Sequence, residues 1–438
     1  MASEWSEQSV AELQAARVLL VEDGNHGENR PRPDEFSTEG VQFIRAADMD
    51  SGRVLFESAQ RINEAARQRV RKGIGAGGDV LLSHKGTVGK VAYVPSDAPP
   101  FVCSPQTTFW RVKDPNKLDR RYLYFYLLSR AFREQLDSRK GETDMADYVS
   151  LTTQRTLKVT VPPLAEQQSI AAVLGALDDK IELNRRMNVT LEAMARALFQ
   201  SWFVDFDPVR AKLDGRQPVG MDEATAALFP NSFEETEAGH IPKGWMPLRL
   251  SDAIEVNPRR LLRKGSVAPY LDMKNLPTQG HSAEVVIDRE FSSGSKFQNG
   301  DTLLARITPC LENGKTGYVD FLEDGQVGWG STEYIVFAPK SPLPPQFGYL
   351  LARSDALRSH AIQNMTGTSG RQRVPSECFN TFWLAVPSPE VARRFDELTS
   401  PLMAKIKANS TESSTLATLR DTLLPKLLSG EIATGLTS

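Results

Sequence analysis

The sequence predicts an α+β protein built from two tandem mixed α/β domains and two long helices. The segment VPPLAEQQSIAAVLGALDDKIELN (Val161–Asn184) has a later counterpart, VPSPEVARRFDELTSPLMAKIKAN (Val386–Asn409). Both ends are offset by 225 positions (386 − 161 and 409 − 184), so no gap separates the copies. Each copy reads as the end of a strand, a proline stop and a long helix. A duplicated strand-to-helix junction predicts a duplicated module.

Further matches occur in the same order before each junction. GDVLLSHKGTVGKVAYV (Gly78–Val94) is echoed by GDTLLARITPCLENGKTGYVDF (Gly300–Phe321), and YLLSR (Tyr126–Arg130) by YLLAR (Tyr349–Arg353). The strand-like runs DVLLSHK, KVAYVP, TTFWRV and TLKVTVP have the counterparts DTLLAR, TGYVDF, TEYIVF and FWLAVP. Amphipathic helices follow in RRYLYFYLLSRAFREQL and PQFGYLLARSDALRSHAI. Each module is therefore expected to be α+β, with a largely antiparallel or mixed sheet.

Length and composition favour a multidomain globular protein. The 438 residues exceed one ordinary core, and 40% hydrophobic with 24% charged residues fits a soluble chain. No apolar run approaches the ~18 residues of a membrane span, and the start shows no export signal. Three dispersed cysteines predict a reducing cytoplasm. The net charge of −3 neither announces nor excludes a nucleic-acid partner, because local clustering decides.

The first junction leads into a helix whose apolar residues recur about every 3.5 positions, the pattern of a coiled-coil seam. Its seam positions are Ile170, Leu174, Leu177, Ile181, Asn184, Asn188, Leu191, Ala195, Leu198 and Trp202. Adding 225 gives Phe395, Thr399, Leu402, Ile406, Asn409, Ser413, Leu416, Arg420, Leu423 and Leu427. Both seams are mostly apolar at their ends and polar in the middle.

Two arrangements of these helices are open. Each helix could pack on its own domain, but a helix of about 33 residues is ~50 Å long at ~1.5 Å per residue, which favours pairing. If the pair runs antiparallel, Asn184 and Asn409 meet near the midpoint and fix the register. Pro401 and Pro425 are expected to kink, delay or end the second helix.

These patterns divide the chain into six parts. The first domain is assigned to 1–163 and the first long helix to 164–204. The second domain is assigned to 244–388, the second long helix to 389–431 and a tail to 432–438. Between the copies, 205–243 carries Asp205, Asp207, Asp214, Asp222, Glu223, Glu234, Glu235 and Glu237. Its acidic residues, prolines and glycines predict an irregular connector along the surface.

Basic residues gather in or beside the predicted loops, where they suit contacts with phosphates and base edges. In the first copy they are His84, Lys85, Lys90, Arg111, Arg139, Lys140 and Arg155. In the second they are Arg306, Lys315, Arg371 and Arg373. Asn25 and His26, in VEDGNHGENRPR, could hydrogen-bond bases, although a plain turn fits equally well. An ordinary solvated face is the competing interpretation for each basic residue.

Known catalytic motifs are not satisfied. HKGTVGKV lacks the first glycine and the final Ser or Thr of a phosphate-binding loop, and NPRR lacks the rest of an amino-methyltransferase motif. The five histidines and three cysteines show no zinc spacing, and no Gly-x-Ser-x-Gly elbow is present. The residues therefore predict no catalytic site, no bound cofactor and no metal.

Several motifs resemble one family, the specificity subunits of type I restriction–modification systems. They are the PPLAEQQ junction entering LDDKIELNRRMN, the module start GWMPLRLSDAI, GDTLLAR, and the closing LRDTLLPKLLSGEI. The resemblance covers essentially the whole chain and is weakest in the loops. The second junction departs from the pattern, because PSPEVARR lacks Glu-Gln-Gln.

The resemblance implies two target-recognition domains, each reading one half of a split double-stranded DNA sequence. It implies that the two long helices form an antiparallel coiled coil that sets the spacer and docks two methyltransferase subunits. Restriction subunits then complete an ATP-dependent, S-adenosylmethionine-using complex, to which this chain supplies neither cofactor site. Two other classes stay open from the residues: a duplicated coiled-coil adaptor that reads no DNA, and an autonomous DNA enzyme.

Overall fold

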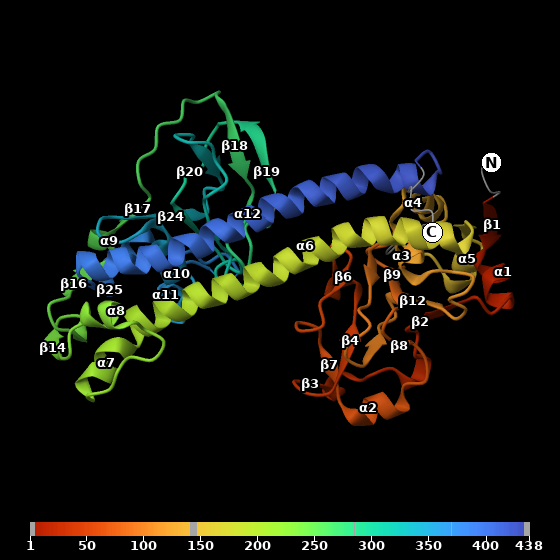
Figure 1. Cartoon of the computed structure of the whole chain (residues 1–438), viewed down its shortest axis with the longest axis horizontal. Helices are drawn as coiled ribbons and strands as arrows, with labels where there is room; N and C mark the ends of the chain where they lie inside the picture. The colour runs from red at the N-terminus through yellow and green to blue at the C-terminus, as the bar shows by residue number, and fades with distance from the viewer. Residues whose placement is uncertain (1–4, 141–146, 284, 369, 433–438) are drawn as a thin grey trace. The chain divides into compact units, whose positions relative to one another are not determined.

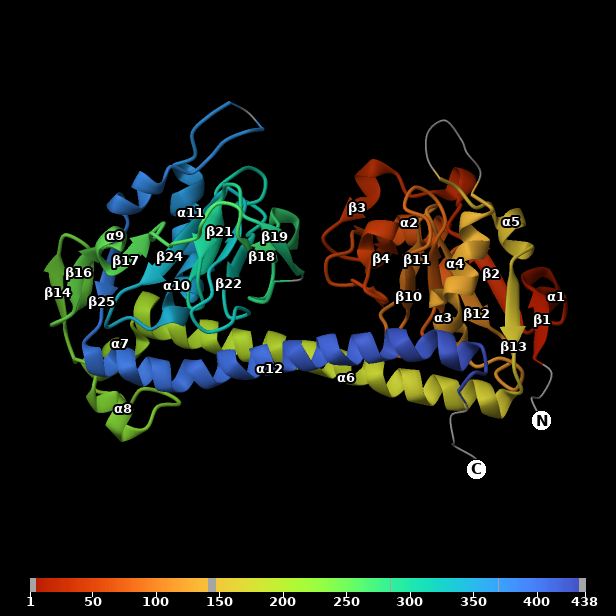
Figure 2. The same cartoon turned by 90° about the horizontal axis from the view of Figure 1, so that it is seen from above.

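The computed structural model describes residues 5–140, 147–283, 285–368 and 370–432 (Figures 1 and 2). It forms two compact units. Unit 1 comprises the residues up to 181 together with those from 415 onward, and unit 2 comprises residues 182–414. Each unit therefore contains one α/β domain and a stretch of both long helices. Residues 433–438 of the expected tail lie outside the described residues.

Unit 1 contains two small sheets. The first holds β2 (Leu19–Asp23), β9 (Val80–Ser83), β10 (Val91–Tyr93) and β12 (Thr107–Val112). The second holds β3 (Phe36–Ser37), β4 (Val41–Ile44), β7 (Arg61–Ile62), β8 (Ile74–Gly75) and β11 (Phe101–Cys103). The first sheet is antiparallel in the order β10-β9-β12-β2. The second has the order β3-β7-β4-β11-β8, with β4 and β11 parallel.

Short helices cover the sheets of unit 1. They are α1 (Val10–Ala15), α2 (Glu64–Arg69), α3 (Arg120–Leu128), α4 (Arg130–Asp137) and α5 (Leu151–Arg155). Helix α3 begins at its N-cap Asp119, whose carboxylate accepts from two backbone N–H groups. Its buried aromatic face packs with Trp110 in the main core, which removes a large apolar area from water. A separate pair, β1 (Ser6–Ser9) and β13 (Lys158–Val161), leads the chain into the first long helix.

Unit 2 repeats this topology. Its strands are β16 (Met246–Arg249), β17 (Ile254–Val256), β18 (Val267–Leu271), β19 (Val286–Glu290), β20 (Ser295–Phe297), β21 (Thr302–Ala305), β22 (Thr316–Tyr318), β23 (Gly328–Gly330), β24 (Tyr334–Pro339) and β25 (Trp383–Val386). The order β22-β21-β24-β17 matches β10-β9-β12-β2. The order β19-β18-β23-β20 keeps the parallel pair, now β18 and β23. Helices α9 (Leu250–Ala253), α10 (Pro345–Ala352) and α11 (Asp355–Gln363) take the places of α1, α3 and α4.

The duplication extends to single hydrogen bonds. In unit 1 the Val149 N–H donates to the His84 carbonyl at 2.9 Å, and in unit 2 the Val374 N–H donates to the Arg306 carbonyl at 2.8 Å. Val149 and Val374 are 225 residues apart (374 − 149), as the repeated junction predicts. The two domains therefore share one fold, and the expected tandem duplication of an α+β module is confirmed.

The long helices are α6 (Leu164–Phe199), followed by the π-helix η4 (Gln200–Val204), and α12 (Pro389–Leu428). Within unit 2, Asn184 Nδ2 donates to Glu412 Oε2 at 2.8 Å, and Asn188 Nδ2 donates to Ser410 Oγ at 3.1 Å. Rising numbers on α6 meet falling numbers on α12, so the helices pair antiparallel. Within unit 1, Arg420 Nη1 of α12 donates to Asp178 Oδ1 of α6 at 2.7 Å.

The seam positions face inward in both units. Ile170, Asn184, Ile406 and Asn409 are buried, and Leu177, Ile181, Leu191, Leu198, Leu402, Leu416 and Leu423 are half-buried. The second helix neither starts late at Pro401 nor ends at Pro425, contrary to expectation. Both prolines are exposed, where water can satisfy the carbonyl that a proline leaves unpaired. Packing of the helix's buried face against the core of unit 2 outweighs the lost hydrogen bonds.

The acidic segment between the copies is more regular than its composition predicts. It forms α7 (Asp207–Leu213), α8 (Glu223–Ala227) and a hairpin of β14 (Phe233–Thr236) and β15 (Gly239–Pro242). The expectation of an irregular connector is therefore wrong. Apolar residues spaced among the acidic ones, including Val209 and Phe229, are buried in the core of unit 2 and hold these elements in place.

Candidate nucleic-acid interface

Two of the predicted DNA contacts are buried histidines. His26 is 6% exposed, and its Nε2–H donates to the Cys103 carbonyl at 2.9 Å. His84 is 2% exposed, and its Nδ1–H donates to the Val149 carbonyl at 3.1 Å. Burial lowers the pKa of both imidazoles, so both are neutral near neutral pH. The expectation that these two side chains touch DNA is corrected: each ties one loop to its neighbour.

Lys90 and Lys315 are equivalent residues with the same internal role. Lys90 Nζ donates to carbonyl oxygens at 3.1 and 2.8 Å, at the two ends of the 3-10 helix η3 (Ala46–Asp48). Lys315 Nζ donates to two carbonyl oxygens of the 3-10 helix η5 (Met273–Asn275), at 2.7 and 2.9 Å. They are 225 residues apart (315 − 90). We therefore remove both lysines from the set of DNA contacts, because their ammonium groups satisfy turn carbonyls.

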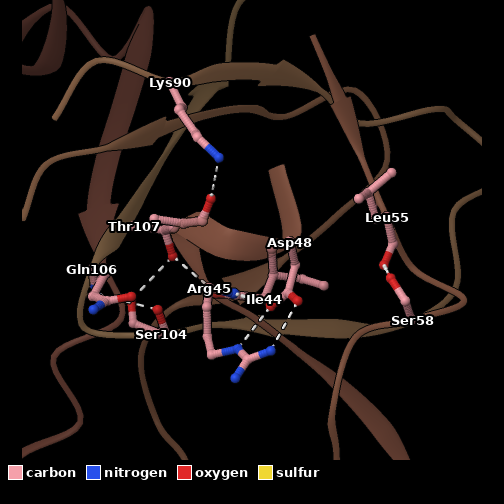
Figure 3. Close-up of polar contacts among 10 residues, drawn as sticks. Ile44, Arg45, Asp48, Leu55, Ser58, Lys90, Ser104, Gln106 and Thr107 are labelled. Carbon is pink, nitrogen blue, oxygen red and sulfur yellow. Dashed lines mark hydrogen bonds and ion pairs between the residues drawn. The ribbon is translucent and has the colours of Figure 1, made fainter. Parts of the chain in front are cut away.

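Figure 3 shows how the turn below Lys90 is fixed. The Arg45 guanidinium donates to both Asp48 carboxylate oxygens at 3.0 Å, and this ion pair raises the pKa of the Arg45 side chain. Thr107 Oγ1 donates to the Ile44 carbonyl at 3.2 Å. An ion pair, a hydroxyl and the lysine thus hold one turn together, which identifies this cluster as structural.

The other predicted residues divide into paired and open side chains. Lys140 lies 2.8 Å from Asp137, and Arg373 lies 2.7 Å from Glu333, so local carboxylates partly neutralise both cations. Arg111, weighed with the basic loop residues, forms an ion pair with Asp79 at 2.7 Å. Arg139 donates to the Gln135 carbonyl at 3.1 Å, and Arg306 is half-buried. The fully exposed ones are Asn25, Lys85, Arg155 and Arg371.

Asn25 belongs to a concave basic surface at the end of β2. A cavity of about 300 Å³ is lined by Asn25, His26, Gly27, Asn29, Arg71 and Lys72. Gly73 sits at a positive φ of +66°, and a Cβ there would lie 2.8 Å from Gly24 Cα, so the two loops meet closely only through glycine. The Gly73 N–H donates to Glu22 Oε1 at 2.7 Å, which fixes this approach.

The basic half of this surface was not predicted from the sequence. Arg67, Arg69, Arg71 and Lys72 form a run of four cations in RQRVRKG, and such runs are typical of nucleic-acid contacts. Arg69 is taken up by Glu35, with Nη1 2.8 Å from Oε1, and this ion pair lowers the pKa of Glu35 to about 2. Arg71 and Lys72 are exposed at the cavity and form no ion pair with any described residue.

Other kinds of site find no support in the described parts of the chain. No group of three or more His, Cys, Asp or Glu residues lies close enough to hold a metal ion among them. Among the same residues, no helix combines the length and the hydropathy that crossing a bilayer requires.

Comparison with known proteins converges on one family. The model of the type I restriction modification DNA specificity domain matches residues 26–193. The HindI specificity subunit of Haemophilus influenzae is 25% identical over 90% of this chain and 94% of its own length. The MjaIX specificity subunit of Methanocaldococcus jannaschii is 24% identical over 90% of this chain and 87% of its own. The crystal structure of the M. genitalium type I S subunit matches the fold with a TM-score of 0.51 at 15% identity, covering 97% and 96% of the chains.

Two duplicated α/β domains joined to an antiparallel pair of long helices, with exposed basic loops, define a bipartite recognition protein. The family model and the full-length relatives give the class its name. The chain belongs to the DNA specificity subunits of type I restriction–modification systems. These comparisons support the specificity subunit and give no support to a coiled-coil adaptor without DNA reading.

Proposed function

We propose that this chain reads a two-part DNA sequence, one half with each domain, and leaves catalysis to its partners. The first reader occupies 1–163 and the second 244–388, with 164–204 and 389–431 as spacer helices. The segment 205–243 connects the copies and 432–438 forms the tail. Methyl transfer, ATP use and cleavage would then belong to other subunits, and the complex would act in the cytoplasm.

One observation carries this proposal: the same scaffold occurs twice with different chemistry at equivalent exposed positions. Tyr148 and Arg373 form equivalent single bridges, with Lys85 and Ile307 respectively. An aromatic side chain thus stands where the other copy has a cation. Two readers of different half-sequences need a shared frame and divergent loops, whereas a duplicated structural module has no such need.

The affinity follows from general electrostatics. Exposed cations such as Lys85, Arg71 and Arg371 would contact phosphates, so binding weakens as salt rises. A good bidentate contact with a base edge contributes ~1–3 kcal/mol of discrimination. Two readers on one chain gain from their effective concentration only when both half-sequences lie at the right separation. The coiled coil would set that separation.

The surface of α6 supports docking of partner subunits on the coil. Leu183 is 52% exposed, Met194 is 49% exposed and Met187 between them is half-buried. Their spacing of four and seven residues places them on one face of the helix. Such an apolar stripe would suit helices of methyltransferase subunits, of which we propose two, with restriction subunits joining that assembly.

The test uses the chain together with its cognate methyltransferase subunits. Affinity for duplex DNA is measured between about 50 and 200 mM salt, and methylated sites are mapped by sequencing in cells that contain the same subunits. We expect a steep loss of affinity with salt and a single methylated motif in two parts. A continuous motif, or binding indifferent to salt, would overturn the proposal.

A further inference from the structure

A loop in the second domain combines fixed ends with an exposed apolar tip. Residues 257–266, NPRRLLRKGS, join β17 to β18 and form the long green segment that climbs from β17 to β18 in Figure 1. At its base Asn257 has a positive φ of 55°, a strained conformation for a residue with a side chain. Backbone and side chain both hold it, because its N–H donates to the Val336 carbonyl at 2.7 Å and its Oδ1 accepts from the Val336 N–H at 3.0 Å.

The other end of the loop is equally fixed. The Gly265 N–H donates to the Phe291 carbonyl at 2.9 Å, and the Phe291 N–H donates to the Ser266 carbonyl at 2.8 Å. Gly265 has a φ of +86°, which only glycine adopts easily. A loop held at both ends loses little entropy when it binds, so it is suited to present side chains to a partner.

Within the loop, alternate side chains have opposite roles. Arg260 points inward and donates to Asp301 at 2.7 Å, and Leu262 packs against the small core of Phe291 and Trp329. These inward residues account for the stability of the loop. Leu261, by contrast, is 84% exposed and contributes no burial to the fold.

The outward side of the loop is positively charged. Arg259, Arg263 and Lys264 are exposed on either side of Leu261 and form no ion pair within the described residues. The loop contains no acidic residue. Three uncompensated cations around a protruding leucine attract a polyanion, and leucine flanked by arginine is the kind of side chain that enters DNA grooves.

The neighbouring sheet face has the same chemistry. On β19, Ile287 is 53% exposed and the Arg289 guanidinium lies 4.9 Å from the centre of the Tyr270 ring. Strand pairing places Ile287 beside Tyr270 and Arg289 beside Ala268, so these side chains share one face. In unit 1 the face of the equivalent strand β4 packs against α2 in a small apolar cluster. Unit 2 has no helix between β18 and β19 where α2 would stand among the described residues.

We propose that residues 257–266 form the duplex-DNA contact of the second domain. Leu261 would meet base edges in a groove, while Arg259, Arg263 and Lys264 bind the flanking phosphates and Arg289 extends the contact along β19. The assignment rests on the proposed function, which it deepens by naming the reading surface. An acidic protein partner is the competing occupant, and the test separates the two.

The test pairs each loop variant with a matched control in the same unit. L261A is compared with L213A, which truncates a leucine 58% exposed on α7, and R263Q/K264Q is compared with K243Q, an exposed lysine elsewhere. The probe is a duplex carrying the sequence methylated in cells with the wild-type chain. Binding is measured with methyltransferase subunits present.

We expect R263Q/K264Q to lower the slope of log affinity against log salt by about 1.8, because each phosphate that is no longer neutralised lowers the slope by about 0.9. We expect L261A to reduce discrimination at the second half-sequence about tenfold and to leave the first unchanged. The control variants should match wild type. Circular dichroism of each variant confirms that it folds.

Three results would overturn the assignment, and they are distinguishable. If the wild-type complex shows no salt-dependent binding, the proposed function itself fails. If the wild type binds and the loop variants behave as their controls, the function stands and the loop assignment fails. If the loop variants bind DNA normally but lose methyltransferase subunits during purification, the loop is a protein contact.

Discussion

Tyr349 of the second domain donates its hydroxyl hydrogen bond to Glu192 Oε1 of α6 at 2.7 Å, in a buried setting. Its equivalent Tyr124, 225 residues earlier (349 − 124), has a side-chain hydrogen bond with Asp178 of the same helix. Burial raises the pKa of both phenols, so both are donors at neutral pH. Each copy of the duplicated domain therefore attaches to α6 through the same tyrosine and a carboxylate.

The first prediction concerns this attachment. Y349F leaves the Glu192 carboxylate, which is 7% exposed, without its buried donor, and we expect the free energy of unfolding to fall by about 1–3 kcal/mol. Urea unfolding measures the change. Y318F is the control, because the Tyr318 ring packs near Tyr349 and its hydroxyl has no hydrogen-bond partner among the described residues. Equal stability of the two variants would count against an attachment role.

The second prediction concerns the polar centre of the coil. Asn409 Nδ2 donates to Asn188 Oδ1 at 2.8 Å, and Asn409 is 1% exposed. N409L or N188L alone should destabilise the protein by about 1–3 kcal/mol, because one buried amide loses its partner. The double variant should recover most of that stability, because two apolar side chains leave nothing unpaired. A double-mutant cycle in urea measures the coupling, and additive effects would show that the pair acts independently.

The large features of this fold could be predicted because they repeat. A spacing of 225 residues and a period of about 3.5 residues are visible in sequence, and they predict both the duplicated module and the paired helices. The direction of side chains could not be predicted. Histidine and lysine look alike in a loop whether they face solvent or a carbonyl, so the sequence predicts DNA contacts for His84 and Lys90 although both hold turns.

Two further outcomes depend on tertiary packing. Pro401 breaks helices by its own geometry, yet α12 continues through it because neighbouring residues are buried in the core. The basic loop at 257–266 escapes prediction because NPRR alone matches no complete enzyme motif. The density of cations in NPRRLLRKG was the signal present in the sequence, but the exposure of Leu261 needs coordinates.

The third prediction follows from the buried imidazoles. Burial lowers the pKa of His26 and His84 below the ordinary 6.5, so the unfolded chain takes up protons first as the pH falls. Their contribution to stability is complete above about pH 6.5 and declines as the pH falls below it. H26Q and H84N keep an N–H donor and remove the titration, so both should flatten the fall in Tm between about pH 7 and 5. Thermal melts measure this.

H240Q is the control for the third prediction. His240 lies at the surface of unit 2, with a side chain 73% exposed, so its replacement removes an imidazole without touching the core. Tm curves of H26Q and H84N that run parallel to those of wild type and H240Q would exclude the buried imidazoles as the source of acid sensitivity.

The fourth prediction separates structural from DNA-facing lysines. K90M and K315M each remove an ammonium group from two carbonyl oxygens, so stability should fall by about 1–2 kcal/mol while the salt dependence of DNA binding stays unchanged. K85Q should do the reverse, lowering the salt slope by about 0.9 with little effect on stability. Salt titrations and urea unfolding on the same preparations test both. A reduced slope in K90M would restore that lysine as a phosphate contact.

The last prediction concerns the length of the coil. Seven residues are inserted in α6 between positions 181 and 182 and in α12 between 414 and 415, which keeps each compact unit intact. Seven residues add about 10 Å at ~1.5 Å per residue and nearly two whole turns, so the seam stays aligned. If the coil is the spacer, the two half-sequences should be unchanged and the gap between them should grow by about three base pairs of ~3.4 Å.

Sequencing of methylated sites in cells that carry the variant with its methyltransferase reads both quantities at once. An insertion of the same length after the exposed Gly220, in the connector, is the control and should leave the gap as it was. New half-sequences with the original gap would mean that the helices shape the readers and do not space them. A longer gap with the original half-sequences would show that distance and recognition reside in separate parts of one chain.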